Sequence, residues 1–154
     1  MGLIMDKKRP TWQEYFMKIA ELTASRSTCF SEQKGAIIVK DGRIVATGYS
    51  GAPSRIKNCL CDIGYCRKRK LGFGHGEGHE YCLAVHAEEN AILSAANIGV
   101  SINGAVLYCT HFPCINCAKS IINCGIKHIF YKNDYNDELS KDILNEAGIE
   151  VEKI

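Results

Sequence analysis

The sequence lacks any run of apolar residues long enough to cross a membrane as a helix. It also lacks an excess of charge, because 19 lysines and arginines stand against 17 acidic residues. This nearly even balance of charge argues against tight binding to DNA or RNA, because the affinity of a protein for nucleic acid depends largely on neutralising phosphates. A small phosphorylated ligand remains compatible with this charge, because one or two local cations are enough to bind it.

Internal repeats and low-complexity segments are also missing. The stretch MGLIMDKKRP has too short an apolar patch for a signal peptide, so we expect a cytoplasmic protein. In that compartment the nine cysteines are expected to be metal ligands or buried thiols rather than disulfides. Their odd number points the same way.

The 154 residues that are present contain 46% apolar and 23% charged residues, the ordinary balance of a globular protein. We expect one domain over residues 1–154, with a Cys/Gly-rich insertion at about residues 50–81 that has no helix or strand period. A segment of that length without regular structure is usually functional or held in place by something.

Around this insertion the hydrophobic pattern predicts helices and strands in alternation. A helix is expected to begin at Pro10 and Thr11, because Thr11 and Glu14 have the spacing of a capping box. A hairpin through Asp41 and Gly42 is expected to join strands at 35–40 and 43–49. Further helices are expected near 87–97, 113–124 and 137–147, and further strands at 105–110, 128–132 and 149–153. This order predicts an α/β fold with three α/β/α layers and a mixed five-stranded central sheet.

Two short motifs contain side chains that bind metals. His86 lies in VHAEENAILSAA, and Cys114 and Cys117 lie in HFPCINCAKSII. Cysteines at this spacing on the first turn of a helix point to the same side, and the positive end of the helix favours their thiolates. One imidazole and two thiolates suit Zn²⁺, and three protein ligands leave room for water, as in catalytic zinc sites. Zinc lowers the pKa of such a water, and Glu88 is the natural candidate to carry its proton.

Each motif alone has a simpler interpretation. A histidine or an acid at a helix start is more often a cap or a partner of the helix dipole, and a lone CxxC is often a redox pair. The combination favours a zinc site, because both motifs stand at helix starts that follow expected strands.

The HAE and PCINC motifs resemble those of the zinc-dependent nucleotide and nucleobase deaminases, whose signature is H-x-E…P-C-x-x-C. From Arg9 to about Tyr135 the chain is similar, in the same order, to the deoxycytidylate (dCMP) deaminase family in RPTWQEYFMKIAELTASRSTC, GAIIVKDGRIVATGY, VHAEENAI, LYCTHFPCINCAKSII and GIKHIFY. The resemblance implies a cytidine deaminase-like fold and one catalytic zinc. It also implies hydrolysis at cytosine C4, in which Glu88 moves protons to N3 and to the leaving amine. The products are deoxyuridylate (dUMP), needed for thymidylate synthesis, and ammonia.

Some members of this family carry a second, structural zinc. The resemblance places Cys29 and Cys59 at its ligand positions, with His79 and Cys82 as the best candidates to complete the site and Cys66 as a close contender. Such a site would hold the insertion in place. The alternative is that these are free buried thiols. Cys61 and His75 belong to the same stretch, and Cys109 and Cys124 are assigned to the core.

The resemblance also implies substrate contacts. Arg26 is expected to bind the 5′-phosphate, and Phe112 and Tyr135 are expected to pack against the base. Ser50 replaces an asparagine that the family uses near the sugar and base. Arg55 replaces a usual glycine and could contact a phosphate or an effector. Simpler interpretations stay open. Arg26 can be a surface arginine, Arg55 a solvated cation of a loop, and Phe112 and Tyr135 aromatic residues of the core.

Family members are often oligomeric and sometimes regulated by deoxycytidine and thymidine triphosphates (dCTP and dTTP). The resemblance therefore implies a homo-oligomer with these as candidate effectors, and no nucleic-acid or membrane partner is expected. Two alternatives remain. One is a deaminase that acts on another substrate: free cytosine, a nucleoside or adenosine in tRNA. An enzyme that acts on tRNA should have a basic surface. The other is a non-catalytic zinc-stabilised module, which predicts four protein ligands at the metal instead of three and a water.

Overall fold

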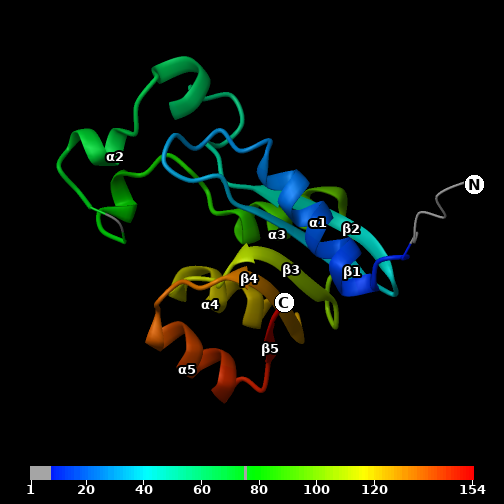
Figure 1. The fold of residues 1–154 in the computed structure, drawn as a ribbon. Helices are drawn as coiled ribbons and strands as arrows, with labels where there is room; N and C mark the ends of the chain where they lie inside the picture. The colour runs from blue at the N-terminus through cyan, green and yellow to red at the C-terminus, as the bar shows by residue number, and fades with distance from the viewer. Residues whose placement is uncertain (1–7, 75) are drawn as a thin grey trace, which may run out of the picture.

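The computed structural model in Figure 1 describes residues 8–74 and 76–154, so most of the N-terminal stretch quoted above and His75 lie outside it. The strands are β1 (Gly35–Lys40), β2 (Arg43–Tyr49), β3 (Val106–His111), β4 (His128–Asn133) and β5 (Glu150–Lys153). They form one sheet in the order β2-β1-β3-β4-β5. β1 runs antiparallel to both of its neighbours, whereas β3, β4 and β5 are parallel. The predicted mixed five-stranded sheet is confirmed.

Helices cover both faces of this sheet. They are α1 (Trp12–Ala24), α3 (Ala87–Ile98), α4 (Ile115–Asn123) and α5 (Glu138–Glu146). Successive strand residues point to opposite faces, so Ile37 of β1 packs with Phe16 of α1, whereas Ile38 belongs to the core that includes Ile121 of α4 and Leu144 of α5. The three predicted layers are therefore present, with α1 alone on one face (Figure 1).

Short-range features of the sequence fix the ends of these elements. The side chain of Thr11 accepts a hydrogen bond from the backbone of Glu14, and the carboxylate of Glu14 accepts one from the backbone of Thr11. The predicted capping box is thus confirmed. Asp41 and Gly42 have φ angles of 51° and 71°, the left-handed values that a tight hairpin of this kind requires.

The insertion contains only short helical turns, in agreement with its lack of period. These are η1 (Cys59–Ile63), α2 (Arg67–Lys70) and η2 (His79–Tyr81). A bridge between Gly51 and Val85 closes the segment, so it extends slightly beyond the predicted boundary. It projects from one end of the sheet, next to the start of α3 (Figure 1). None of the helices in the described part of the chain is long and apolar enough to span a membrane.

Gly48 allows β2 and α3 to approach closely. A Cβ atom added at Gly48 would lie 2.2 Å from the carbonyl oxygen of Ala87 and 2.3 Å from the amide nitrogen of Ala91. Both neighbours are backbone atoms, so they cannot move aside as a flexible side chain would. The separation between the sheet and the helix that begins at His86 therefore depends on this glycine.

We expect Gly48→Ala to destabilise the protein by about 1–3 kcal/mol, because the added methyl group forces α3 away from the sheet. Thermal unfolding should show a midpoint lowered by several degrees. Thr47→Ala is the matched control, because Thr47 is the exposed neighbour on the same strand. Equal midpoints for the two variants would mean that α3 is free to shift on the sheet.

Candidate active site

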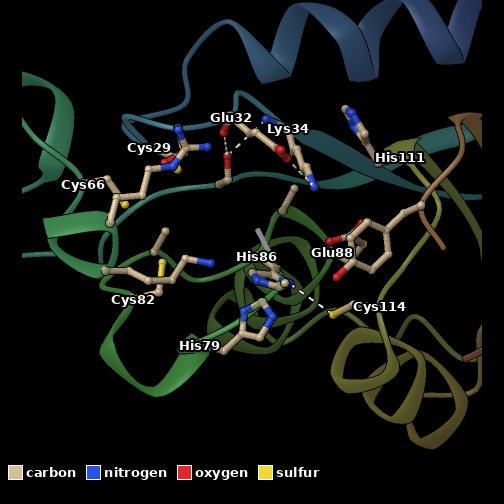
Figure 2. Close-up of a pocket in the computed structure, with 18 of the residues that line it drawn as sticks. Cys29, Glu32, Lys34, Cys66, His79, Cys82, His86, Glu88, His111 and Cys114 are labelled. Atoms are coloured by element: carbon tan, nitrogen blue, oxygen red, sulfur yellow. Dashed lines mark hydrogen bonds and ion pairs between the residues drawn. The ribbon is translucent and has the colours of Figure 1, made fainter. Parts of the chain in front are cut away.

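Two helix starts meet at one end of the sheet. His86 is the N-cap residue of α3, and Cys114 is the N-cap residue of α4. Cys117 lies inside the first turn of α4, where it is completely buried. Cys114 was expected within the first turn but has an extended backbone, with ψ at 169°, one residue before the helix. Its side chain still faces His86 (Figure 2).

The three side chains are within metal-binding distance of one another. His86 Nδ1 lies 3.3 Å from Cys114 Sγ and 3.4 Å from Cys117 Sγ. Tetrahedral zinc with its usual bond lengths would place nitrogen and sulfur about 3.5 Å apart, so the donor set fits this metal. Among the described residues, no fourth His, Cys, Asp or Glu has a donor atom within 4.8 Å of the donor atoms of all three. The arrangement agrees with three protein ligands, as in a catalytic site.

Hydrogen bonds and burial change the acidity of these groups. The pKa of Cys114 is lowered to about 3, chiefly by its hydrogen bond with Cys117 and also by that with His86. The pKa of His86 is raised, mainly by the same contact with Cys114. The pKa of Cys117 is raised, because its hydrogen bond to Cys114 and its burial favour the thiol. One thiolate is therefore already stabilised, which favours the binding of a cation.

Glu88 adjoins this cluster and is only 5% exposed. Its Oε2 atom is 3.5 Å from Cys117 Sγ. Burial raises the pKa of Glu88, and a carboxyl group with a raised pKa can both accept and return a proton near neutral pH. The neighbouring Glu89 is not part of the pocket wall.

Asp137 and Ser140 support the turn that carries Cys114. Asp137 accepts hydrogen bonds from the amide of Ile115 at 2.8 Å and from the amide of Ser140 at 3.0 Å, so one carboxylate caps both α4 and α5. The hydroxyl of Ser140, which is fully buried, donates to the carbonyl oxygen of Pro113 at 2.7 Å. The residues on either side of Cys114 are thus fixed from α5. The sequence indicated Asp137 only as a helix start.

A pocket lies above His86, Glu88 and Cys114 (Figure 2). Of the predicted substrate contacts, Ser50, Phe112 and Tyr135 are in its wall, whereas Arg26 and Arg55 are exposed elsewhere. Arg26 directly follows the C-cap of α1. Sequence reasoning missed several wall residues, because no motif marks them: Glu32, Lys34, Lys68, Arg69 and His111.

Ser50 is buried, and its hydroxyl group is already used within the protein. It accepts from the amide of Lys34 at 3.1 Å, donates to the carbonyl oxygen of Glu32 at 3.0 Å and pairs with the hydroxyl of Ser27 at 2.7 Å. A hydroxyl has one proton and two acceptor positions. Ser50 therefore joins three segments of the chain, and little capacity is left for a direct bond to a sugar.

The insertion cysteines are only partly brought together. Cys29, Cys66 and Cys82 line the pocket, but Cys59 does not. Within the described residues, no three of the ligands predicted for the second zinc have their donor atoms within 4.8 Å of one another, and none of the nine cysteines is in a disulfide. His79 lies edge-on to His86, with ring centroids 5.7 Å apart. Cys66, the alternative ligand, lines the same side of the pocket as Cys29 and Cys82 (Figure 2).

Comparisons with known proteins agree with this geometry. The chain is 42% identical over 144 residues to the deoxycytidylate deaminase of Saccharomyces cerevisiae, which covers 93% of this chain and 45% of the relative. It is 39% identical over 131 residues to the deoxycytidylate deaminase of Mycobacterium phage D29, which covers 82% and 98% of the two chains. The chain spans less than half the length of the yeast protein and of its Schizosaccharomyces pombe counterpart.

A solved structure has the same fold. The dCMP deaminase of cyanophage S-TIM5, crystallised with dCMP and dUMP, superposes with a TM-score of 0.76 at 36% identity, over 96% of this chain and 99% of that one. Residues 10–133 match the family described as the cytidine and deoxycytidylate deaminase zinc-binding region. This match includes both metal-ligand motifs and most of the chain, and the chain therefore belongs to that family.

Proposed function

We propose that the chain is a zinc-dependent hydrolase that converts dCMP and water to dUMP and ammonia, and so supplies dUMP for thymidylate synthesis. The observation that carries the proposal is the buried carboxyl of Glu88 beside the His86, Cys114 and Cys117 cluster, at the bottom of a pocket. The named relatives and the dCMP-bound neighbour support the choice of nucleotide.

Nδ1 of His86 and the Sγ atoms of Cys114 and Cys117 would hold the metal. Zinc bound there would supply the Lewis acidity that makes water a nucleophile near neutral pH. Glu88 would take one proton from the attacking water and pass it to N3 of the cytosine while the water oxygen forms a bond with C4. Glu88 would then take the proton of the new C4 hydroxyl and deliver it to the exocyclic amine, so that the C4 carbonyl forms, the bond between C4 and nitrogen breaks, and ammonia leaves.

Aromatic side chains would position the base. Phe112 is buried at the start of the Pro-Cys turn and packs edge-on against Tyr131, with centroids 5.2 Å apart. Tyr135 shares the pocket wall with Phe112, and Lys34 lies 5.3 Å from the centre of its ring. A flat aromatic base can stack against such side chains. Ser50 would contribute to the wall beside the sugar and not a direct hydrogen bond.

Further parts of the proposal concern assembly and setting. A single catalytic domain with its insertion would work as a homo-oligomer in the cytoplasm, with dCTP and dTTP as effectors, as the family resemblance implies. Free thiols at all nine cysteines suit a reducing compartment. A second, structural zinc would bind at the insertion, with Cys29, Cys59, His79 and Cys82 as candidate ligands. Cys66, which lines the pocket together with Cys29 and Cys82, is the alternative ligand.

A substrate panel tests the function. We expect the zinc-loaded protein to release ammonia from dCMP at least about 100-fold more efficiently, in kcat/KM, than from cytosine, cytidine or deoxycytidine, because these compounds lack the phosphate and a polar site discriminates strongly against analogues that lack a group it binds. Preferential turnover of cytosine or a nucleoside would show that the proposed substrate is wrong and that the proposed hydrolytic deamination is right. No ammonia from any compound would favour the non-catalytic zinc module.

A further inference from the structure

Lys68 is a buried cation in the pocket wall. It belongs to α2 of the insertion and is 9% exposed. It lines the same pocket as His86 and Glu88. In the part of the chain that the structure describes, no ion pair or hydrogen bond engages its ammonium group. Lys34, in the same wall, differs because it pairs with Glu32 at 2.7 Å.

The ammonium nitrogen of Lys68 is not among the enclosed unpaired atoms of the described residues, so it keeps some contact with solvent although most of the side chain is buried. The described contacts of Lys68 include no anion, so an anionic ligand in the pocket is the expected partner of this cation. The next residue, Arg69, lines the pocket as well, with an exposed side chain. This side of the pocket therefore presents two adjacent cations, one on a largely buried side chain and one on an exposed side chain.

The position of these cations suits one end of a nucleotide. Figure 2 shows Cys66, two residues before Lys68, and Cys82 across the pocket from Glu88 and Cys114. A base that reacts beside Glu88 would direct its 5′-phosphate away from the metal ligands and toward this insertion side. Arg26, the phosphate ligand predicted from the sequence, is exposed outside the pocket.

We propose that Lys68, assisted by Arg69, binds the 5′-phosphate of the substrate and thereby makes the insertion the element that selects a nucleotide over a nucleoside. The proposal rests on the function proposed above. Charge-assisted hydrogen bonds from lysine and arginine to phosphate are short and strong.

A structural role for Lys68 makes a different prediction. Burial raises the pKa of Cys82, and Lys68 is near enough to oppose that effect by favouring the thiolate. A lysine that served only to neutralise the insertion cysteines would support every substrate equally. Its removal would lower stability or metal content and would not change the preference for the phosphate.

The test compares Lys68→Met and Arg69→Met with Arg67→Met, an exposed neighbour on α2 that does not line the pocket. We expect Lys68→Met to lower kcat/KM for dCMP by about 30-fold, mainly through KM, because one charged hydrogen bond is lost. Turnover of deoxycytidine should change less than about threefold in the same variant, since it has no phosphate to lose. Arg69→Met should show a smaller loss of the same kind, Lys68→Arg should restore most of the activity, and Arg67→Met should resemble the wild type.

Equal losses for dCMP and deoxycytidine, or an unchanged KM for dCMP, would overturn the proposal. A binding experiment separates the phosphate site from the proposed function. Calorimetry measures the affinity of dCMP and of deoxycytidine for the Glu88→Gln variant, with and without the additional Lys68→Met change. If the wild type turns over neither compound, the function fails. The phosphate site then still stands only if the Lys68 change weakens dCMP binding selectively.

Discussion

Glu88→Gln should reduce the turnover number for dCMP by at least about 10³-fold while the zinc content stays unchanged, because proton transfer by one positioned side chain contributes on this scale. Glutamine has nearly the shape of glutamate but cannot accept and return the proton. Glu88 is buried next to Cys117, so a substitution that conserves volume should leave the three proposed metal ligands in place. The measurement is steady-state ammonia release, together with metal analysis of the same preparation.

Glu89→Gln is the control for this change, because Glu89 is the next acid along α3 and does not line the pocket. It should retain nearly full activity. Glu88 would be excluded as the proton carrier if its glutamine variant kept a tenth or more of the wild-type turnover. Loss of zinc in that variant would instead show that Glu88 supports the metal site.

Cys114→Ala should remove one equivalent of zinc and lower dCMP turnover below detection, at least about 10³-fold, because water without a metal has a pKa near 15.7 and is a poor nucleophile. Cys114 contacts Nδ1 of His86 directly and is the thiol most stabilised as thiolate. Its half-buried position at the N-cap allows α4 to fold without it. Zinc per chain is counted by elemental analysis after dialysis.

The matched control is Cys124→Ala at the other end of the same helix. Cys124 is also half-buried, and its thiol donates to the carbonyl oxygen of Ile121 without facing the site. It should keep wild-type zinc content and turnover. Full zinc binding and activity in Cys114→Ala would rule out this cysteine as a ligand. The number of zinc ions per chain in the wild-type protein also decides whether the insertion holds a second zinc.

Local signals predicted most of the scaffold. The capping box at Thr11 and the turn at Asp41 and Gly42 involve contacts over a few residues, so their sequence patterns are nearly sufficient. The grouping of His86 with Cys114 and Cys117 was also predictable, because each motif sits at a helix start and the sheet brings helix starts to a common end.

The pocket wall was less predictable, because its residues are placed by an insertion without period. Lys68 and Arg69 form part of a run of basic residues that ordinarily lies in solvent, and only the path of the insertion brings them to the pocket. Arg26 resembled a phosphate ligand from its sequence context, but the end of α1 leaves it exposed. The hydroxyl group of Ser50 forms its hydrogen bonds with partners from separate segments of the chain, which no single motif reveals.

The double cap at Asp137 has a practical consequence for anyone who trims this chain. The region shared with the family ends at residue 133, so a fragment cut there would keep every proposed zinc ligand and Glu88 but would lose Asp137 and Ser140. The amide of Ile115 and the carbonyl of Pro113 would then lose their hydrogen-bond partners. Such a fragment would contain the complete signature and yet lack the brace that keeps Cys114 facing His86.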